Sequence, residues 1–155
     1  MDRISKNFKI IKSAKEKIYK AFTDEKALEF WLAPYEMTGK IHDFDLRVGG
    51  GYDMSLFYVK DKTSGKTSGN EDRFTAKFIE LKPYDKIIQT INFQSDKHEF
   101  AEEMIMEVFL EEAEQDCTKV TIIFKNIPIG VDPKDNEAGT AESLEKLASY
   151  IDHNQ

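Results

Sequence analysis

Apolar residues return every three or four positions between residues 137 and 151, and no other long stretch of the chain shows this helical period so clearly. They share one face of a helix: Ala138, Ala141, Leu144, Leu147, Ala148 and Ile151. The opposite face is polar, with Glu142, Glu145, Lys146 and Ser149. A helix with one apolar stripe has to bury that stripe against another element, so the pattern predicts a last helix that packs on a sheet.

The preceding chain alternates with the period of two that is typical of strands with one buried face. The first such segment surrounds Phe8 and Ile10. In the second, we expect one side to consist of His42, Phe44, Leu46 and Val48. A bulged hairpin turn at Gly49-Gly50-Gly51 should follow. Five further segments alternate through residues 52–59, 74–78, 87–93, 104–110 and 120–124, so we expect about seven antiparallel strands.

Two short helices are expected between the first and second strands. Ser13 and Glu16 fit a capping box, in which the serine side chain accepts from the backbone of the glutamate, so a helix should begin there. Asp24 can cap a second helix, which Pro34 ends. The polar segment 60–70 is expected to form a long hairpin tip. The order is thus strand, two short helices, six strands and a long helix, which is an α+β fold.

Length and composition narrow the class of protein. The chain has 155 residues, which suits one domain spanning 1–155, and its 29 acidic and 22 basic residues give a net charge of −7. Nucleic-acid binding needs clustered cations, so it is not expected. No apolar run is long enough for a signal peptide or a membrane span, and Cys117 has no disulfide partner in the chain. We therefore expect a cytoplasmic protein.

Three groups of local motifs indicate a family. They are Glu29-Phe30-Trp31-Leu32-Ala33-Pro34, then Gly39-Lys40-Ile41-His42-Asp43-Phe44-Asp45-Leu46-Arg47-Val48-Gly49-Gly50-Gly51-Tyr52, and finally Asn126-Ile127-Pro128 with Asn136-Glu137-Ala138-Gly139-Thr140 and Ser143-Leu144. Over essentially its whole length the chain resembles the activator of heat-shock protein 90 ATPase homologue family, within the START/SRPBCC superfamily. The resemblance implies a helix-grip fold, in which a curved antiparallel sheet wraps around the terminal helix and leaves an apolar cavity between them.

The resemblance also concerns partners. Eukaryotic co-chaperones of this family have an additional N-terminal domain for the middle segment of the chaperone, whereas this sequence begins directly with its first predicted strand. We therefore expect that domain to be absent from the chain. Family members also form dimers, and the sequence predicts no interface for a homodimer.

A cavity of this kind would be lined by the inward side chains of the sheet and of the last helix. Aromatic and methionine side chains, which suit varied apolar ligands, are frequent among them. The candidate ligand-binding residues are Trp31, Phe44, Tyr52, Met54, Tyr58, Phe74, Phe78, Gln89, Ile91, Phe93, Met104, Met106, Phe124, Leu144 and Leu147. Trp31 either covers one mouth of the cavity or anchors its helix to the sheet. Tyr52, Tyr58 and Gln89 either orient a ligand or form hydrogen bonds within the core.

The sequence indicates no catalytic group. Asp43, Asp45 and Arg47 share one face of the second strand, and Asp53 across the hairpin should pair with Arg47, so this cluster is interpreted as an ion pair. His42 is expected on the opposite face from these carboxylates.

Four other motifs lack the spacing or setting that their chemistry requires. His42, His98 and His153 are too far apart for a zinc site, and no cofactor is indicated. Gly65-Lys66-Thr67 lacks the first glycine of a phosphate-binding loop, and the triple glycine lacks the spacing of a dinucleotide fingerprint. Ser143 has no nucleophile elbow around it.

We therefore expect a helix-grip domain that binds an apolar or amphipathic small molecule between its sheet and its last helix. Two alternatives stay open. One is a protein-interaction module related to chaperone ATPase activators. The other is an enzyme of the polyketide-cyclase kind, which would need converging polar groups in the cavity.

Overall fold

Seven antiparallel strands form one sheet in the order β1-β7-β6-β5-β4-β3-β2. The computed structural model describes residues 3–59 and 69–154. The strands are β1 (Ser5–Ile11), β2 (Met37–Asp45), β3 (Gly51–Tyr58), β4 (Glu71–Lys82), β5 (Lys86–Phe93), β6 (Met104–Glu112) and β7 (Thr118–Lys125). The helices are α1 (Lys15–Phe22), α2 (Glu25–Trp31) and α3 (Pro133–His153), with a 3₁₀ turn η1 at His98–Phe100. The predicted α+β helix-grip order of elements is confirmed.

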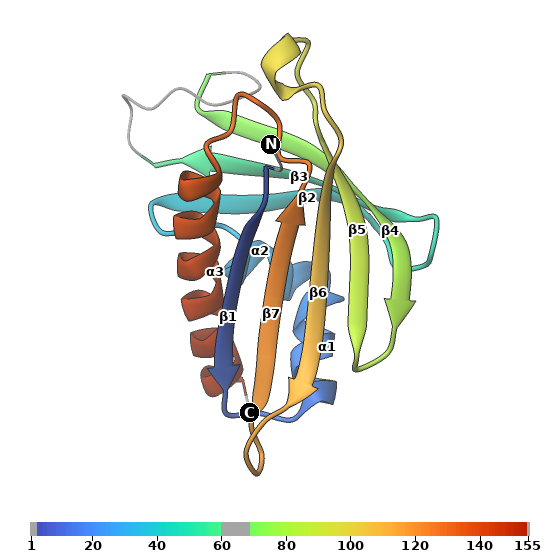
Figure 1. Ribbon diagram of the computed structural model, residues 1–155, viewed down its shortest axis with the longest axis vertical. Coiled ribbons are helices and arrows are strands. Elements are labelled where there is room, and N and C mark those ends of the chain that lie inside the picture. The colour runs from blue at the N-terminus through green and yellow to red at the C-terminus, as the bar shows by residue number, and fades with distance from the viewer. Residues whose placement is uncertain (1–2, 60–68, 155) are drawn as a thin grey trace.

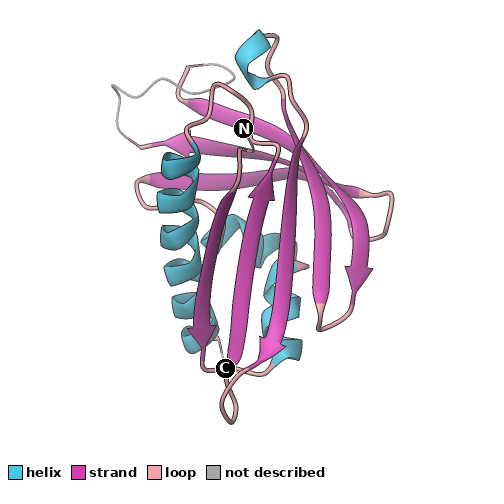
Figure 2. Ribbon diagram, viewed as in Figure 1, coloured by secondary structure: helices cyan, strands magenta, loops and turns pink. Residues whose placement is uncertain are grey.

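The sheet is strongly curved, so its two edges run in different directions (Figure 1). In this view β1, β7 and β6 follow the long axis of the molecule, whereas β2 and β3 cross that direction at the opposite edge. Helix α3 runs beside β1, and α1 and α2 lie behind the sheet (Figure 2). Sheet and helices therefore surround one common interior, with the polar faces of both turned outward.

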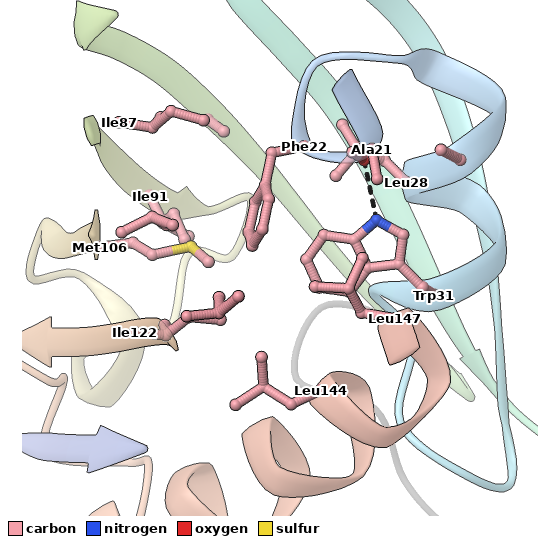
Figure 3. Close-up of a cluster of buried hydrophobic side chains, with 14 of the residues drawn as sticks. Ala21, Phe22, Leu28, Trp31, Ile87, Ile91, Met106, Ile122, Leu144 and Leu147 are labelled. Atoms are coloured by element: carbon pink, nitrogen blue, oxygen red, sulfur yellow. Dashed lines mark hydrogen bonds between the residues drawn. The ribbon is translucent and has the colours of Figure 1, made fainter. Parts of the chain in front are cut away.

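A cluster of buried apolar side chains joins α1, α2 and the second half of α3 to the sheet (Figure 3). The ring centroids of Phe22 and Trp31 are 4.7 Å apart in an edge-to-face arrangement. Trp31 is fully buried, and its Nε1–H donates to the carbonyl oxygen of Ala21 at 2.9 Å. Because a buried indole N–H needs a partner, this bond fixes the end of α2 against α1.

The turn from β2 to β3 has little room for side chains at its end. A Cβ atom on Gly51 would lie 1.8 Å from the carbonyl oxygen of Ala76 in β4, so a larger residue does not fit. Gly49 has a φ of 91°, in the left-handed region that favours glycine. Glycine is therefore required at both ends of this predicted hairpin turn.

The predicted alternation is interrupted within β2: Phe44 faces the interior as expected, whereas Ile41 and His42 lie on the faces opposite to those predicted. A bulge between Ile41 and Asp43 shifts the register against β3, so Ile41 and Phe44 both face the interior. The strand ends at Asp45, and Leu46 and Val48 are exposed in the turn. One extra residue reverses the face of every later side chain, and a period of two does not show where that residue stands.

The buried face of α3 also differs from the predicted stripe. Its large residues Leu144, Leu147 and Ile151 are buried as expected. Ala138 and Ala141 are instead exposed, and the inward positions of this half belong to Thr140 and Ser143. Their hydroxyls donate to backbone carbonyls, of Asn136 at 2.8 Å and of Leu32 at 2.7 Å, so both can be buried without an unpaired group.

One of the two predicted helix caps is wrong. Helix α1 begins at Lys15 with Ala14 as its N-cap and no side-chain cap, while the Ser13 carbonyl accepts from the Thr118 hydroxyl at 2.7 Å. Asp24 caps α2 as predicted, accepting from the backbone N–H of Lys26 at 3.2 Å. The predicted hairpin tip, with its Gly65-Lys66-Thr67 motif, lies largely outside the described residues.

Candidate functional site

A cavity of about 760 Å³ lies between the sheet and the first half of α3. The sheet contributes mostly apolar side chains to its wall: Tyr52, Phe74, Ile91, Phe93, Met104, Met106, Ile122 and Phe124. Helix α3 contributes Asp135, Asn136, Ala138, Gly139, Thr140, Glu142 and Ser143, and its buried members, Thr140 and Ser143, are small. Such short side chains do not reach the curved sheet, so space remains between the two layers. Small-molecule sites in proteins have volumes of roughly 300–1,000 Å³.

The predicted ligand-binding residues divide into two groups. Those that line the cavity are Trp31, Tyr52, Tyr58, Phe74, Ile91, Phe93, Met104, Met106 and Phe124. Those outside its lining are Phe44, Met54, Phe78, Gln89, Leu144 and Leu147. The second group belongs to the packed interior instead, as Figure 3 shows for Leu144 and Leu147. For all of them, contact with a ligand stays a prediction.

Loops, the turn η1 and the first half of α3 contribute a polar rim that the sequence did not indicate. The rim consists of Tyr35, Glu36, Lys97, Glu99, Phe100, Gly130, Asp132, Asp135 and Glu142. Backbone hydrogen bonding joins two of these segments, since the N–H of Gly130 donates to the Glu99 carbonyl at 2.8 Å. Arg3 holds the loop before α3 by donating from Nε to the Ile127 carbonyl at 2.9 Å. These segments are distant in sequence and share no periodicity, so only the tertiary fold reveals the rim.

Trp31 combines the two roles that the sequence left open. Its indole N–H anchors α2 through the carbonyl of Ala21, and the side chain also lines the cavity. Leu144 and Leu147 belong to the same buried cluster as Trp31 and do not line the cavity (Figure 3). Trp31 therefore belongs both to the packed core and to the cavity wall.

Tyr52 and Gln89 form a buried polar pair beside the apolar wall. The amide Nε2 of Gln89 donates to the Tyr52 hydroxyl at 2.9 Å and lies 3.5 Å from the sulfur of Met106. Burial raises the pKa of Tyr52 to about 12, since the phenolate would lose its hydration, while the hydrogen bond from Gln89 acts in the opposite direction. The tyrosine is therefore a neutral hydroxyl at any physiological pH.

Nearer the rim, Tyr58 and Asp72 form a second polar pair. The Tyr58 hydroxyl donates to the Asp72 carboxylate at 2.9 Å, and Asp72 is only 2% exposed. Both residues line the cavity. A buried carboxylate needs such donors, so the hydroxyl proton of Tyr58 is already in use.

The rim is predominantly negative. Among the described lining residues Lys97 is the one basic side chain, whereas Glu36, Asp72, Glu99, Asp132, Asp135 and Glu142 are acidic. Asp132 caps α3 by accepting from the backbone N–H of Lys134 at 2.9 Å, and Glu142 accepts from the backbone N–H of Tyr35 at 2.9 Å. These bonds hold the carboxylates in place without neutralising their charge.

On the outer face of the sheet, a serine, a histidine and a carboxylate are in contact but do not form a catalytic triad. His42 Nε2 lies 2.9 Å from Ser55 Oγ, and that hydroxyl donates to Glu71. In a triad the histidine stands between the serine and the acid, so that it can take the serine proton. Here the serine stands in the middle and is fully buried, so its oxygen is inaccessible to a substrate. The contacts join β2, β3 and β4 instead.

The predicted ion pair between Asp53 and Arg47 is wrong. Asp53 pairs with Arg73 of β4 through two hydrogen bonds, of 2.8 and 3.1 Å, and Arg47 pairs with Asp45 within its own turn at 2.7 Å. The Arg73 guanidinium lowers the pKa of Asp53, and the nearby His42 contributes in the same direction. The bulge explains both errors, because it turns His42 outward beside Asp53 and leaves Arg47 beyond the end of β2.

Within residues 3–59 and 69–154, no group of three or more His, Cys, Asp or Glu side chains is arranged to hold a metal ion. In the same residues, no helix combines the length and the apolar character needed to cross a bilayer.

The cavity, its curved sheet and its closing helix agree with the sequence comparison. Residues 12–152 match the family described as Activator of Hsp90 ATPase homolog 1-like protein. The chain belongs to this family. Among curated proteins, none matches the sequence.

Solved structures show the same fold in several bacterial proteins. Protein CV1439 from Chromobacterium violaceum is 26% identical, with a TM-score of 0.85 over 96% of both chains. A protein from Arthrobacter aurescens is 16% identical, with a TM-score of 0.79 over 97% of this chain and 86% of its own. The Mll3558 protein from Rhizobium loti is 22% identical, with a TM-score of 0.73 over 96% of both chains. These similarities support the helix-grip fold of the chain.

Proposed function

We propose that this family member binds an apolar or amphipathic small molecule in the cavity between its sheet and the first half of α3. The observation that supports the proposal is a cavity of about 760 Å³ whose inner wall is aromatic and aliphatic and whose rim is polar. Removing apolar ligand surface from water stabilises a complex by roughly 25 cal/mol per Å². The polar rim would keep the opening hydrated and accommodate the polar end of an amphipathic ligand.

Fluorescence titration with Nile red, a neutral amphipathic dye, tests the proposal. We expect saturable binding of one dye per chain, and native mass spectrometry of protein purified without added ligand should reveal any molecule already bound. Met104→Trp places an indole in the cavity wall and should weaken dye binding by about tenfold or more. The matched control is Ile105→Trp, because Ile105 is the next residue on β6 and faces away from the cavity.

The two tryptophan variants decide the outcome. If the wild-type protein shows no saturable dye binding, or if Met104→Trp and Ile105→Trp change the affinity equally, binding in this cavity is ruled out. Circular dichroism of both variants confirms that a loss of binding is not a loss of fold.

A second function draws support from the outer face and from the name of the family. Phe8 and Ile10 are 60% and 55% exposed on the edge strand β1, an apolar surface of the kind that partner proteins cover. A chaperone partner bound there would be independent of the cavity. If so, Phe8→Ser with Ile10→Ser should abolish stimulation of the ATPase of the cognate chaperone, and Met104→Trp should preserve it.

A further inference from the structure

The hydrogen bonds of the buried Tyr52 and Gln89 pair leave one donor without an acceptor. Together the two side chains have three polar hydrogens, one on the phenol and two on the amide. One hydrogen forms the bond between them, and a second points towards the sulfur of Met106, a weak acceptor, at 3.5 Å. Among the described residues, no acceptor exists for the hydroxyl hydrogen of Tyr52.

The spare donor does not depend on how the glutamine amide is turned. If its oxygen and nitrogen exchange places, the phenol donates to Oε1, and the hydrogens of Nε2 then have no partner at the opposite position. Tyr52 and Gln89 are 4% and 5% exposed, so bulk water does not satisfy this donor freely. A buried donor without an acceptor costs free energy that a bound acceptor would recover.

The donor lies beside the cavity and its side chain is held in place. Tyr52 and Met106 both line the cavity. The ring of Tyr52 is surrounded by aromatic rings, with centroid distances of 5.9 Å to Phe44, 5.8 Å to Phe78 and 6.2 Å to Phe74. A hydroxyl fixed in this way by its neighbours is ready to donate without losing rotational freedom on binding.

The charges of the rim select against anions. Glu99, Asp132, Asp135 and Glu142 line the entrance, and none of the four forms an ion pair with a described residue. An anionic ligand would have to pass these carboxylates and then give up its own hydration in an apolar interior. A carboxylate would therefore be a poor choice of acceptor, and a carbonyl a good one.

We propose that the ligand is a neutral, largely apolar molecule with a hydrogen-bond acceptor of the carbonyl class, which accepts from the Tyr52–Gln89 pair inside the cavity. This inference rests on the proposed function and adds the chemical class of the ligand to it. The phenol stays protonated across the physiological range, so it donates at every pH the protein meets.

Three naphthalenes of similar size test the proposal by isothermal titration calorimetry. They are 2-acetylnaphthalene, which has a carbonyl, 2-ethylnaphthalene, which has none, and the anion 2-naphthoate. With the unchanged full chain we expect the acetyl compound to bind roughly fivefold more tightly than the ethyl compound, as one net hydrogen bond provides. The anion should bind about tenfold more weakly than the acetyl compound.

Two variants identify the donor. Tyr52→Phe with Gln89→Met removes all three polar hydrogens, so the preference for the acetyl compound should disappear while the ethyl compound keeps its affinity. Tyr58→Phe is the matched control, since Tyr58 lines the same cavity from the same strand and its hydroxyl already donates to Asp72. That control should keep the preference.

Each outcome decides one of the two proposals. Equal affinities of the acetyl and ethyl compounds for the unchanged protein would overturn the proposed acceptor, and so would a preference that survives in the double variant. Either result would leave the proposed binding in the cavity standing. A trapped water would then accept the free hydrogen of the Tyr52–Gln89 pair. If none of the three compounds binds, the proposed acceptor falls, and the proposed function falls with it if Nile red also fails to bind. The probe comparison needs no variant, so it decides the question even if the double variant does not fold.

Discussion

The two halves of α3 face the same sheet and are packed in opposite ways. In the second half Leu144, Leu147 and Ile151 are at most 2% exposed and belong to the packed core. In the first half Ala138, Gly139, Thr140 and Ser143 line a cavity instead. Both halves belong to one regular helix of 21 residues, so the backbone does not create the difference. The size of the side chains decides where the interior is filled and where it is hollow.

The inward hydroxyls of the hollow half are satisfied by backbone carbonyls. Ser143 donates to the carbonyls of Leu32 and Gly139, at 2.7 and 3.1 Å, and Thr140 donates to that of Asn136. These bonds remove the penalty of turning hydroxyls inward. Packing thus fixes the second half of α3, and hydrogen bonds to backbone carbonyls fix the first.

Truncating one side chain of the packed core and one of the cavity wall should test this comparison with the largest effect. Leu147→Ala leaves a sealed void in the packed half, and we expect the free energy of unfolding to fall by about 3 kcal/mol. Met104→Ala at the cavity wall enlarges an existing space, so the expected loss is only about 1 to 2 kcal/mol. Urea denaturation of both variants measures the two values, and equal losses would mean that the cavity is filled as tightly as the core.

Alkaline pH should lower the free energy of unfolding through Tyr52, which lines the cavity. Its pKa is raised from 10.0 to about 12 in the folded protein, so the unfolded chain loses this proton first. The stabilisation is therefore complete below pH 10 and is lost as the pH rises from 10 to 12, by about 2 to 3 kcal/mol. Denaturant unfolding across this range measures the slope.

The slope of the free energy of unfolding against pH has a direct control. Tyr52→Phe cannot ionise, so its free energy of unfolding should change less between pH 10 and 12 than that of the wild-type protein. Equal slopes in the two proteins would show that Tyr52 is accessible to water, in contradiction to its burial beside the cavity.

Sequence periodicity predicted the fold well because burial repeats every second residue along a strand and every three or four residues along a helix. The strands around Phe74, Ile91, Met106 and Ile122 bury alternate residues as expected, and the last helix buries its large apolar residues. The errors occur where a single residue interrupts the repeat. The bulge at His42 is such a place. Because of it, Asp53 pairs with Arg73 and not with Arg47, the predicted partner.

The site was predictable only in part. An inward aromatic side chain such as Phe74 follows from alternation, but whether it faces a void depends on what stands opposite to it in three dimensions. The informative residues were the small ones on α3, and a search for large apolar residues passes over Thr140 and Ser143. The rim comes from segments brought together by the fold, and no local pattern connects Glu99 with Asp132.

The smallest expected change in the free energy of unfolding concerns a glycine in the first half of α3. Gly139 lies inside α3, where glycine costs roughly 0.5 to 1 kcal/mol relative to alanine. An added Cβ would meet only the ring of Pro34, at ordinary contact distances of 3.4 Å to its Cγ and 4.0 Å to its Cβ. Gly139→Ala should therefore raise the free energy of unfolding by about 0.5 to 1 kcal/mol. Gly130→Ala, at the same rim, should lower it, because its Cβ would lie 2.9 Å from the backbone oxygen of Glu99. Urea denaturation of both variants measures these opposite signs, and a loss of stability in Gly139→Ala would show that the first half of α3 has no room to spare.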